Sequence, residues 1–272
     1  MKVACLLAIA SGAAAAHAGP HHPSRVLAPF AEGRALKVIS GLMNFDKASV
    51  AKVCSAAEKG GASLVDIACD PELVKVARSK TQVPICVSAV EPERFVAAVD
   101  AGADMVEIGN YDSFYGEGRV FSAEDVMQMT RETRELLPNV PLSVTVPHTL
   151  PLDQQVQLAE ALLAHNVDVI QTEGGTSSRP EGAGVLGMIE KASPSLAATY
   201  EISRCVGSRV HVMAASGITD VTAPLALAMG AAGVGVGSAV NKLEDEMDMT
   251  FAVRRIVDAL AASQVKDSRI AH

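Results

Sequence analysis

The chain has 272 residues, enough for one large domain or two small ones. Apolar residues make up 49% and charged residues 20%, which supplies a buried core and excludes an intrinsically disordered protein. The net charge of −8 disfavours nucleic acid and anionic membrane surfaces as partners, and the chain has no tryptophan for base stacking. We therefore expect a globular protein with a small-molecule partner, and the sequence leaves open whether it forms a homo-oligomer.

The first 35 residues are predicted to be a targeting region. Residues 1–18 contain Lys2, an apolar run and the small-x-small sequence Ala16-His17-Ala18, as in a signal peptide. Residues 19–35 have no acidic residue before Glu32 and are predicted to be a transit-like linker. This order predicts a nucleus-encoded plastid protein, with secretion as the alternative. The apolar run is too short for a membrane span, so we expect no membrane contact in the mature form.

From residue 36 onward, short apolar strands alternate with amphipathic helices. Strands are predicted at residues 36–41, 63–68, 84–89, 104–109, 141–146, 168–172, 209–215 and 233–236. Helices are predicted to begin after Asp46, Asp70, Glu91, Ser122, Leu152, Pro194 and Thr219, and a last helix covers residues 245–262. This alternation predicts an α/β fold, a single (β/α)8 TIM barrel over residues 36–263 with a C-terminal helix and a disordered tail at 264–272.

An internal repeat supports the barrel. A Gly-Ala turn that runs into a strand recurs in three segments and, more weakly, in a fourth: residues 60–68, 101–109, 229–237 and 165–173. The repeat places four residues at equivalent positions of the even-numbered strands: Asp66, Glu107, Gln171 and Gly235. In a TIM barrel alternate strands fill the same interior layer, so these four residues are expected to share one layer.

Two turns of small residues follow the seventh and eighth predicted strands. Adjacent backbone N–H groups without bulky side chains form a concave anion site, and these two loops commonly bind phosphate in TIM barrels. We therefore predict a phosphate-bearing small molecule as ligand. The residues predicted to bind it are Ser216, Gly217, Ile218, Gly235, Gly237 and Ser238.

Four polar residues near strand ends are candidate catalytic groups. Asp66 and Glu107 interrupt apolar strands and are expected to point into the barrel, where a carboxylate is costly unless it is hydrogen-bonded or functional. They are candidates for a general base and acid, and the alternative is a structural hydrogen-bond network. His148 and Glu173 follow the fifth and sixth strands and are the other two candidates, with a surface position as the alternative.

Lysine and metal chemistry are disfavoured by position and spacing. No lysine occurs at the predicted carboxyl end of a strand, and Lys37 lies at the opposite end of the first strand. A Schiff-base aldolase needs an active-site lysine, so this class of enzyme is disfavoured. The five cysteines form no cluster with zinc spacing, and the alternative of a Mg²⁺ site at Asp66 and Glu107 has no recognisable spacing behind it, so no metal site is predicted. Residues 107–118 form a long loop with two tyrosines and a phenylalanine, expected to act as a lid or to cover the barrel mouth.

Taken together, the motifs resemble one uncharacterised family. VISGLMNFD, VDIA, PICVSAV, VEIGNYDSFY, VTVPHTL, IQTEG, ASGI and GVGVGSAV occur in this order over residues 37–243. They are similar to the plastid and cyanobacterial family called hypothetical chloroplast open reading frame twenty-three, a domain of unknown function. The resemblance implies a TIM barrel and a plastid setting, and it supplies no catalytic roles. The leader, which a plastid-encoded member does not need, implies a gene that has moved to the nucleus.

Three functions are compatible with these features. The first is an isomerase, epimerase or lyase in which Asp66 and Glu107 move a proton next to a carbonyl group of a phosphorylated metabolite. The second is an FMN-binding oxidoreductase, because residues 215–239 also resemble the FMN phosphate grip of flavin-dependent barrels, although no basic residue is placed near the flavin N1 position. The third is a non-catalytic metabolite-binding or regulatory module.

Overall fold

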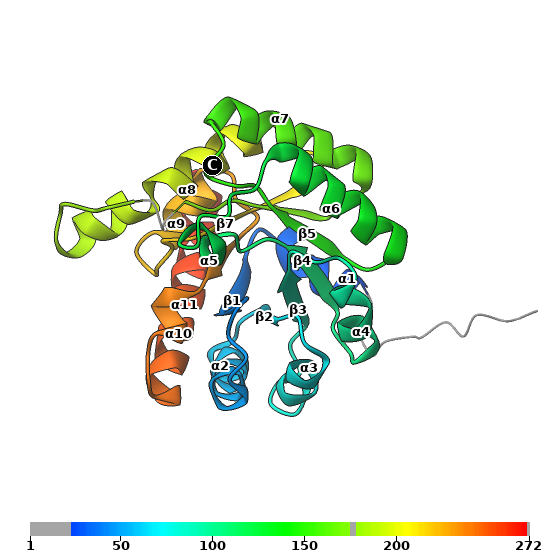
Figure 1. Cartoon of the computed structure of the whole chain (residues 1–272). Coiled ribbons are helices and arrows are strands. Elements are labelled where there is room, and N and C mark those ends of the chain that lie inside the picture. Colours follow the sequence, from blue (N-terminus) through cyan, green and yellow to red (C-terminus); the bar gives the residue numbers. More distant parts are fainter. Residues whose placement is uncertain (1–22, 175–177, 271–272) are drawn as a thin grey trace, which may run out of the picture.

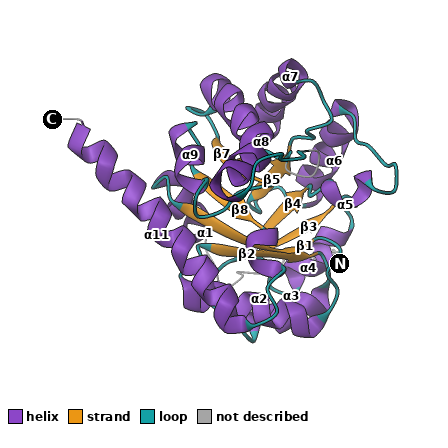
Figure 2. Ribbon diagram, turned by 90° about the vertical axis from the view of Figure 1, so that its left-hand side faces the viewer, coloured by secondary structure: helices purple, strands orange, loops and turns teal. Residues whose placement is uncertain are grey.

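The computed structural model describes residues 23–174 and 178–270. Eight parallel strands form a closed barrel in the order β1-β2-β3-β4-β5-β6-β7-β8. Figures 1 and 2 show the helices arranged around this barrel, with the C-terminal helix α11 running along one side. The predicted TIM barrel is therefore confirmed. The predicted signal-like segment, residues 1–18, lies outside the described residues.

All eight predicted strands are present, and no strand end differs from its prediction by more than two residues. The strands are β1 Ala35–Gly41, β2 Leu64–Ala68, β3 Ile85–Ala89, β4 Met105–Ile108, β5 Leu142–Thr145, β6 Val169–Gln171, β7 His211–Ala215 and β8 Gly233–Val236. The helices are α1 Pro23–Ala31, α2 Lys47–Gly60, α3 Pro71–Arg78, α4 Arg94–Asp100, α5 Asp112–Tyr115, α6 Ala123–Leu136, α7 Leu152–Leu162, the 3-10 helix η1 Leu163–His165, α8 Gly184–Val206, α9 Ala223–Ala228, α10 Ser238–Asn241 and α11 Glu246–Ile270. None of the described helices combines the length and the apolar character that a membrane span requires.

Side-chain caps fix the predicted starts of several helices. The carboxylate of Asp46 accepts a hydrogen bond from the N–H of Ser49, and Asp70 caps α3 in the same way ahead of Pro71. Ser122 and Asp125 form a reciprocal capping box at the start of α6. These caps supply partners for N–H groups that a helix start otherwise leaves unpaired.

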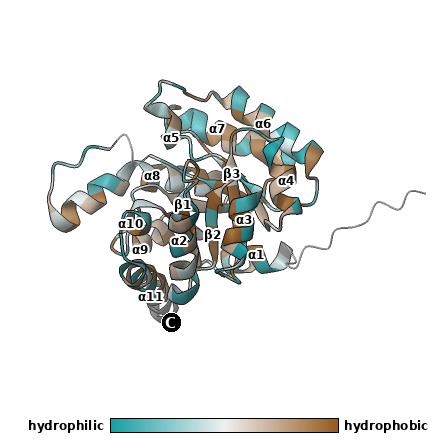
Figure 3. Ribbon diagram, turned by 60° about the horizontal axis from the view of Figure 1, so that its bottom comes forward, coloured by the Kyte–Doolittle hydropathy of each residue, from teal (hydrophilic) through white to brown (hydrophobic). Residues whose placement is uncertain are grey.

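The main core lies between the barrel and the ring of helices. Val50, Val53, Cys54 and Ala57 form the predicted apolar stripe of α2, and all four are fully buried. Figure 3 shows brown, hydrophobic segments concentrated on the central strands, whereas the outer helices such as α6 carry teal, hydrophilic segments on their outer faces. Burial of the helix stripes against the strands therefore holds the barrel in its ring.

The helix α8 begins at Gly184, ten residues before Pro194, after which it was predicted to start. Proline lacks the N–H that would otherwise bond to the carbonyl four residues earlier, which is that of Glu190. The hydroxyl of Ser178 donates to this carbonyl at 2.9 Å instead. The proline is therefore accommodated inside the helix, and the prediction that it marks the helix start is wrong.

The chain before the barrel is structured where a linker was predicted. Residues 23–31, within the predicted linker 19–35, form α1, and Val26 and Phe30 lie four residues apart on one face and are each 1% exposed. They pack in a second apolar cluster with Leu64, Met105 and residues of four further strands, and Phe30 stacks on His211 at a centroid distance of 5.9 Å. The helix therefore closes the amino end of the barrel.

The C-terminal helix is also longer than predicted. It was expected to end at residue 262, with a disordered tail from 264, but α11 continues to Ile270. Neither glycine nor proline occurs between residues 261 and 270, so nothing in that segment terminates the helix.

Closure of the barrel by α1 gives a testable consequence. Phe30→Ala is expected to lower the free energy of unfolding by about 3–5 kcal/mol, because it leaves a cavity under the barrel. Phe251, which is 55% exposed on α11, provides the matched control, and Phe251→Ala is expected to change stability by no more than about 0.5 kcal/mol. Urea unfolding measures both variants, and equal effects would show that α1 contributes nothing specific to the barrel.

Candidate active site

A buried ion pair crosses the barrel interior. The ammonium of Lys37, on β1, donates to Glu107 Oε2 on β4, and both side chains are fully buried. Burial disfavours the charged lysine, but the charges of Glu107 and Asp66 outweigh it and raise the pKa of Lys37. Lys37 lies near the amino end of β1, as the sequence predicted, but its long side chain extends up the barrel to reach Glu107, which strand position alone did not reveal.

The acidic residues of the even strands meet in one network, as the repeat predicted. Asp66 accepts hydrogen bonds from Ser88 Oγ at 2.6 Å and from the side-chain amide of Asn110 at 3.1 Å. The amides of Asn110 and Gln171 both donate to Glu107 Oε1, at 3.2 and 2.9 Å. Burial and the neighbouring charge of Glu107 raise the pKa of Asp66 to about 7, although Lys37 opposes this shift. The arrangement matches the structural-network interpretation of Asp66 and Glu107.

A strained turn directly above this network directs the chain across the barrel mouth. Gly109 has a φ of +152°, and a Cβ there would lie 2.1 Å from Thr145 Oγ1, so only glycine fits. Asn110 follows with a φ of +62°, a conformation that asparagine tolerates better than most residues. The predicted long loop then folds into the short helix α5, and Asp112 and Tyr115 of α5 reach over to the ends of β7 and β6.

A cavity of about 320 Å³ opens at the carboxyl ends of the strands. Five of the six predicted phosphate-binding residues line it: Ser216, Gly217, Ile218, Gly237 and Ser238. Gly235 does not, because it lies inside the barrel, where an added Cβ would be 3.2 Å from Gln171 Oε1. Of the four candidate catalytic residues, Glu173 alone is among the described residues that line the cavity. Asp66 and Glu107 lie beneath Asn110, and His148 lies behind Glu173.

The turns after β7 and β8 present backbone donors to this cavity. Within the described part of the chain, the N–H groups of Gly217, Ile218, Gly237 and Ser238 donate no hydrogen bond. Ser216 and Gly217 have φ values of +73° and +78°, and a Cβ on Gly217 would lie 2.7 Å from the carbonyl oxygen of Lys191. The close approach to α8 therefore requires glycine, and the left-handed turn exposes its N–H groups.

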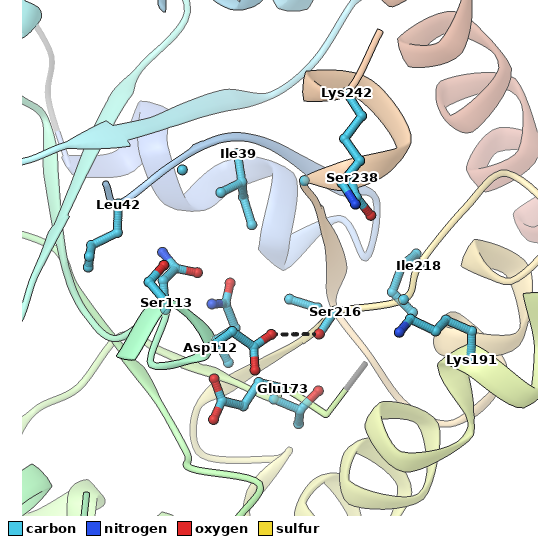
Figure 4. Close-up of a pocket in the computed structure, with 17 residues that line it drawn as sticks. Ile39, Leu42, Asp112, Ser113, Glu173, Lys191, Ser216, Ile218, Ser238 and Lys242 are labelled. Atoms are coloured by element: carbon cyan, nitrogen blue, oxygen red, sulfur yellow. Dashed lines mark hydrogen bonds between the residues drawn. The ribbon is translucent and has the colours of Figure 1, made fainter. Parts of the chain in front are cut away.

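Two lysines that sequence reasoning missed line the same wall of the cavity. Lys191 lies in α8 and Lys242 directly follows α10, and Figure 4 shows Lys191 beside Ile218 and Lys242 beside Ser238. No ion pair within the described residues uses either ammonium, and Lys191 donates only to the carbonyl of Ser178, at 3.2 Å. They come from helices rather than strand ends. The four-residue spacing from Ser238 to Lys242 was the available signal, since it puts both on one face of a helical turn.

An acidic cluster occupies the opposite wall. Glu173, after β6, is 4% exposed, and its Oε1 accepts hydrogen bonds from the Tyr115 hydroxyl and from the backbone N–H and ring Nδ1 of His148, each of the latter at 3.1 Å. Burial raises the pKa of Glu173 and the contact with His148 opposes this, while the same contact raises the pKa of His148. Burial beside the Glu173 charge also raises the pKa of Tyr115.

Asp112 connects the two walls of the cavity. Its Oδ2 accepts a hydrogen bond from Ser216 Oγ at 3.1 Å, shown as the dashed line in Figure 4, and its Oδ1 lies 3.8 Å from His148 Nδ1. Sequence reasoning did not select Asp112, because it follows the strand end by four residues and reaches the site only through the fold of α5. The cavity therefore has a cationic, donor-rich wall facing an acidic one.

Sequence comparisons link the chain to proteins of unknown function. Residues 23–266 match the family described as "Protein of unknown function (DUF561)". The uncharacterized protein ycf23 of Cyanophora paradoxa is 44% identical over 231 residues, covering 85% of this chain and 94% of the relative. That of Porphyra purpurea is 36% identical over 249 residues, covering 92% and 93%. The name ycf23 abbreviates the chloroplast reading-frame family that the motifs resemble, and it indicates plastid-encoded genes for these relatives.

Solved structures share the barrel at low sequence identity. (S)-3-O-geranylgeranylglyceryl phosphate synthase from Thermoplasma acidophilum, in complex with its substrate sn-glycerol-1-phosphate, has a TM-score of 0.60 and 12% identity, covering 88% of this chain and 97% of that one. 3-Hexulose-6-phosphate synthase has a TM-score of 0.57 and 14% identity, covering 83% and 99%. These similarities establish the TIM-barrel fold.

The buried ion pair predicts a large asymmetry between single and double substitutions. Lys37→Met leaves the Glu107 carboxylate uncompensated inside the barrel and is expected to lower the free energy of unfolding by about 3–5 kcal/mol. Lys37→Met combined with Glu107→Gln is expected to recover most of this loss, because both charges are removed together. Denaturant unfolding of the two variants checks this, and a double variant no more stable than the single one would contradict it.

The raised pKa of Asp66 predicts a specific pH dependence. In the unfolded chain the carboxyl titrates near 3.8, whereas in the fold its pKa is about 7. The folded protein therefore binds this proton more tightly, so the stability that Asp66 contributes is complete below about pH 4 and is lost as the pH rises through about 7. Asp66→Asn is expected to flatten the decline in unfolding free energy between about pH 5 and 8. Unfolding curves at several pH values measure this decline, and parallel declines in both proteins would exclude Asp66 as its source.

Proposed function

The chain belongs to the DUF561 family of proteins of unknown function, and within this family we propose that it binds a phosphate-bearing small metabolite and acts on it by isomerisation, epimerisation or lyase chemistry. The phosphate lies at the ends of β7 and β8. The rest of the metabolite extends across the cavity toward Glu173.

The composition of one cavity wall carries this proposal. Two lysines and four residues of the β7 and β8 turns line the same space, and the backbone N–H groups of these four have no partner among the described residues. Backbone N–H groups in such turns bind anions, and lysine adds a full positive charge. A phosphate group satisfies these donors together, and its oxygens can accept several of them at once.

Two structural neighbours support the ligand class through the compounds for which they are named. One contains sn-glycerol-1-phosphate as substrate, and the other is named for a 6-phosphate of a hexulose. Both share the barrel architecture with this chain, in which the loops after the seventh and eighth strands are a common place for phosphate.

Glu173 is the candidate group that acts on the bound metabolite. Its Oε1 is held by Tyr115 and His148, whereas its buried Oε2 has no hydrogen-bond partner in the described residues, and Glu173 lines the cavity. Two roles suit this oxygen: it can accept a proton from a carbon next to a carbonyl group, or it can hold a cation that polarises the carbonyl oxygen. Asp66 and Glu107, one layer below, support Asn110 rather than meet the metabolite.

Phosphate binding can be tested directly with the two lysines. Inorganic phosphate and phosphorylated sugars are expected to raise the Tm of the wild-type chain, because they bind the folded state. A hydrogen bond to a charged group contributes about 1.5–3 kcal/mol, so Lys191→Met with Lys242→Met is expected to weaken binding about tenfold or more. Lys80→Met, at an exposed lysine away from the cavity, is the control. An unchanged Tm shift in the double variant would overturn the proposed site.

Native mass spectrometry with absorbance separates this proposal from its alternatives. A retained phosphorylated metabolite in a colourless protein supports it. Retained FMN with flavin absorbance would instead establish the FMN-binding oxidoreductase. Binding of phosphorylated compounds with no turnover of any of them would favour a metabolite-binding or regulatory module.

A further inference from the structure

Three side chains from separate strand ends meet at the acidic wall. Asp112 begins α5 after β4, His148 follows β5, and Glu173 follows β6. Each offers one atom that can bind a metal, and the three atoms lie within 4.8 Å of one another. Their separation in sequence, 36 and 25 residues, gives no recognisable ligand motif, which is why the sequence predicted no metal site.

Two carboxylate oxygens at this point are buried and have no partner among the described residues. They are Glu173 Oε2 and Asp112 Oδ1. Glu173 is only 4% exposed, and its ion-pair contacts within the described residues are limited to His148, as are those of Asp112. Buried carboxylate oxygens are costly without a hydrogen bond or a cation. Two such oxygens beside one histidine therefore favour a bound positive charge at this place.

The other atoms of these side chains are held in place by neighbours. Glu173 Oε1 accepts from the Tyr115 hydroxyl and from the His148 backbone N–H, and Asp112 Oδ2 accepts from Ser216 Oγ. Outer contacts of this kind orient the ligands of metal sites and leave one atom of each ligand for the ion. The carboxylate atoms left here are Glu173 Oε2 and Asp112 Oδ1. His148 Nδ1 contacts Glu173 Oε1 at 3.1 Å, and it binds an ion by exchanging this contact for the ion.

We infer that Asp112, His148 and Glu173 bind one divalent transition-metal ion at the acidic wall of the cavity. An imidazole nitrogen with two carboxylate oxygens suits Mn²⁺, Fe²⁺ or Zn²⁺ better than Mg²⁺ or Ca²⁺, which favour oxygen ligands alone. Three protein ligands leave coordination positions open toward the cavity. The ion's role there, polarising an oxygen of the metabolite, rests on the proposed function, whereas its binding does not.

Manganese binding to the full chain tests the site. The protein is freed of metal with a chelator and titrated with Mn²⁺, and free Mn²⁺ is followed by electron paramagnetic resonance. One ion per chain is expected. Glu173→Gln and His148→Gln are each expected to weaken binding about 100-fold, and Tyr115→Phe, which removes only an orienting hydrogen bond, about tenfold. Thermal unfolding of each variant establishes that it is folded.

Two control variants separate this site from other metal-binding groups. Asp220→Asn changes an acidic residue that pairs with Arg255 outside the cavity, and His21→Gln with His22→Gln removes the histidine pair near the start of the chain. Both are expected to bind Mn²⁺ like the wild type. Zn²⁺ is expected to displace bound Mn²⁺, whereas millimolar Mg²⁺ is not.

The inference is overturned if the chain binds no stoichiometric Mn²⁺, if Glu173→Gln and His148→Gln bind it as the wild type does, or if only the His21/His22 variant loses it. The first result would assign a water molecule to the unpartnered oxygens. Phosphate binding, measured separately through Lys191 and Lys242, distinguishes failure of the metal site from failure of the proposed function. Retained Mn²⁺ binding, together with a phosphate-induced Tm shift that is absent in the wild type or unchanged in the Lys191→Met/Lys242→Met variant, would overturn the proposed function alone.

Discussion

The buried contact between Lys37 and Glu107 is the constraint on which the polar interior of this barrel depends. A lysine and two acidic residues are buried where none of them can contact water, so each group must form hydrogen bonds or ion pairs with its neighbours. Glu107 takes the lysine on one oxygen and the amides of Asn110 and Gln171 on the other. The position of Asn110 is thereby fixed from below, and the chain that follows it begins from a defined point.

This arrangement links the buried polar network to the mouth of the barrel. Gly109 and Asn110 adopt a turn that few other residues could form, and the turn delivers α5 across the opening. Asp112 then contacts Ser216 at the end of β7, and Tyr115 contacts Glu173 at the end of β6. The two walls of the cavity are thus linked through one short helix, which gives a physical reason for a glycine and an asparagine at the end of β4.

The sequence was informative where a pattern is local and limited where partners come from separate elements. Strand positions followed from apolar runs and from the Gly-Ala repeat, and the equivalence of Asp66 with Glu107 followed from the same repeat. The turns after β7 and β8 were visible as runs of small residues. Lys191, Lys242 and Asp112 were missed because each reaches the cavity from a helix, and the reach of Lys37 was missed because strand position alone does not say how far a long side chain extends.

The two ends of the barrel are chemically separate. At the amino end, Val26 and Phe30 of α1 form an apolar floor with the starts of the strands, and the polar network lies between this floor and the cavity. The described chain therefore enters the fold from below, at Pro23, on the side away from the lysines and the acidic cluster. A fusion partner or surface linkage attached ahead of α1 consequently leaves the mouth of the barrel open to solvent and to its ligand.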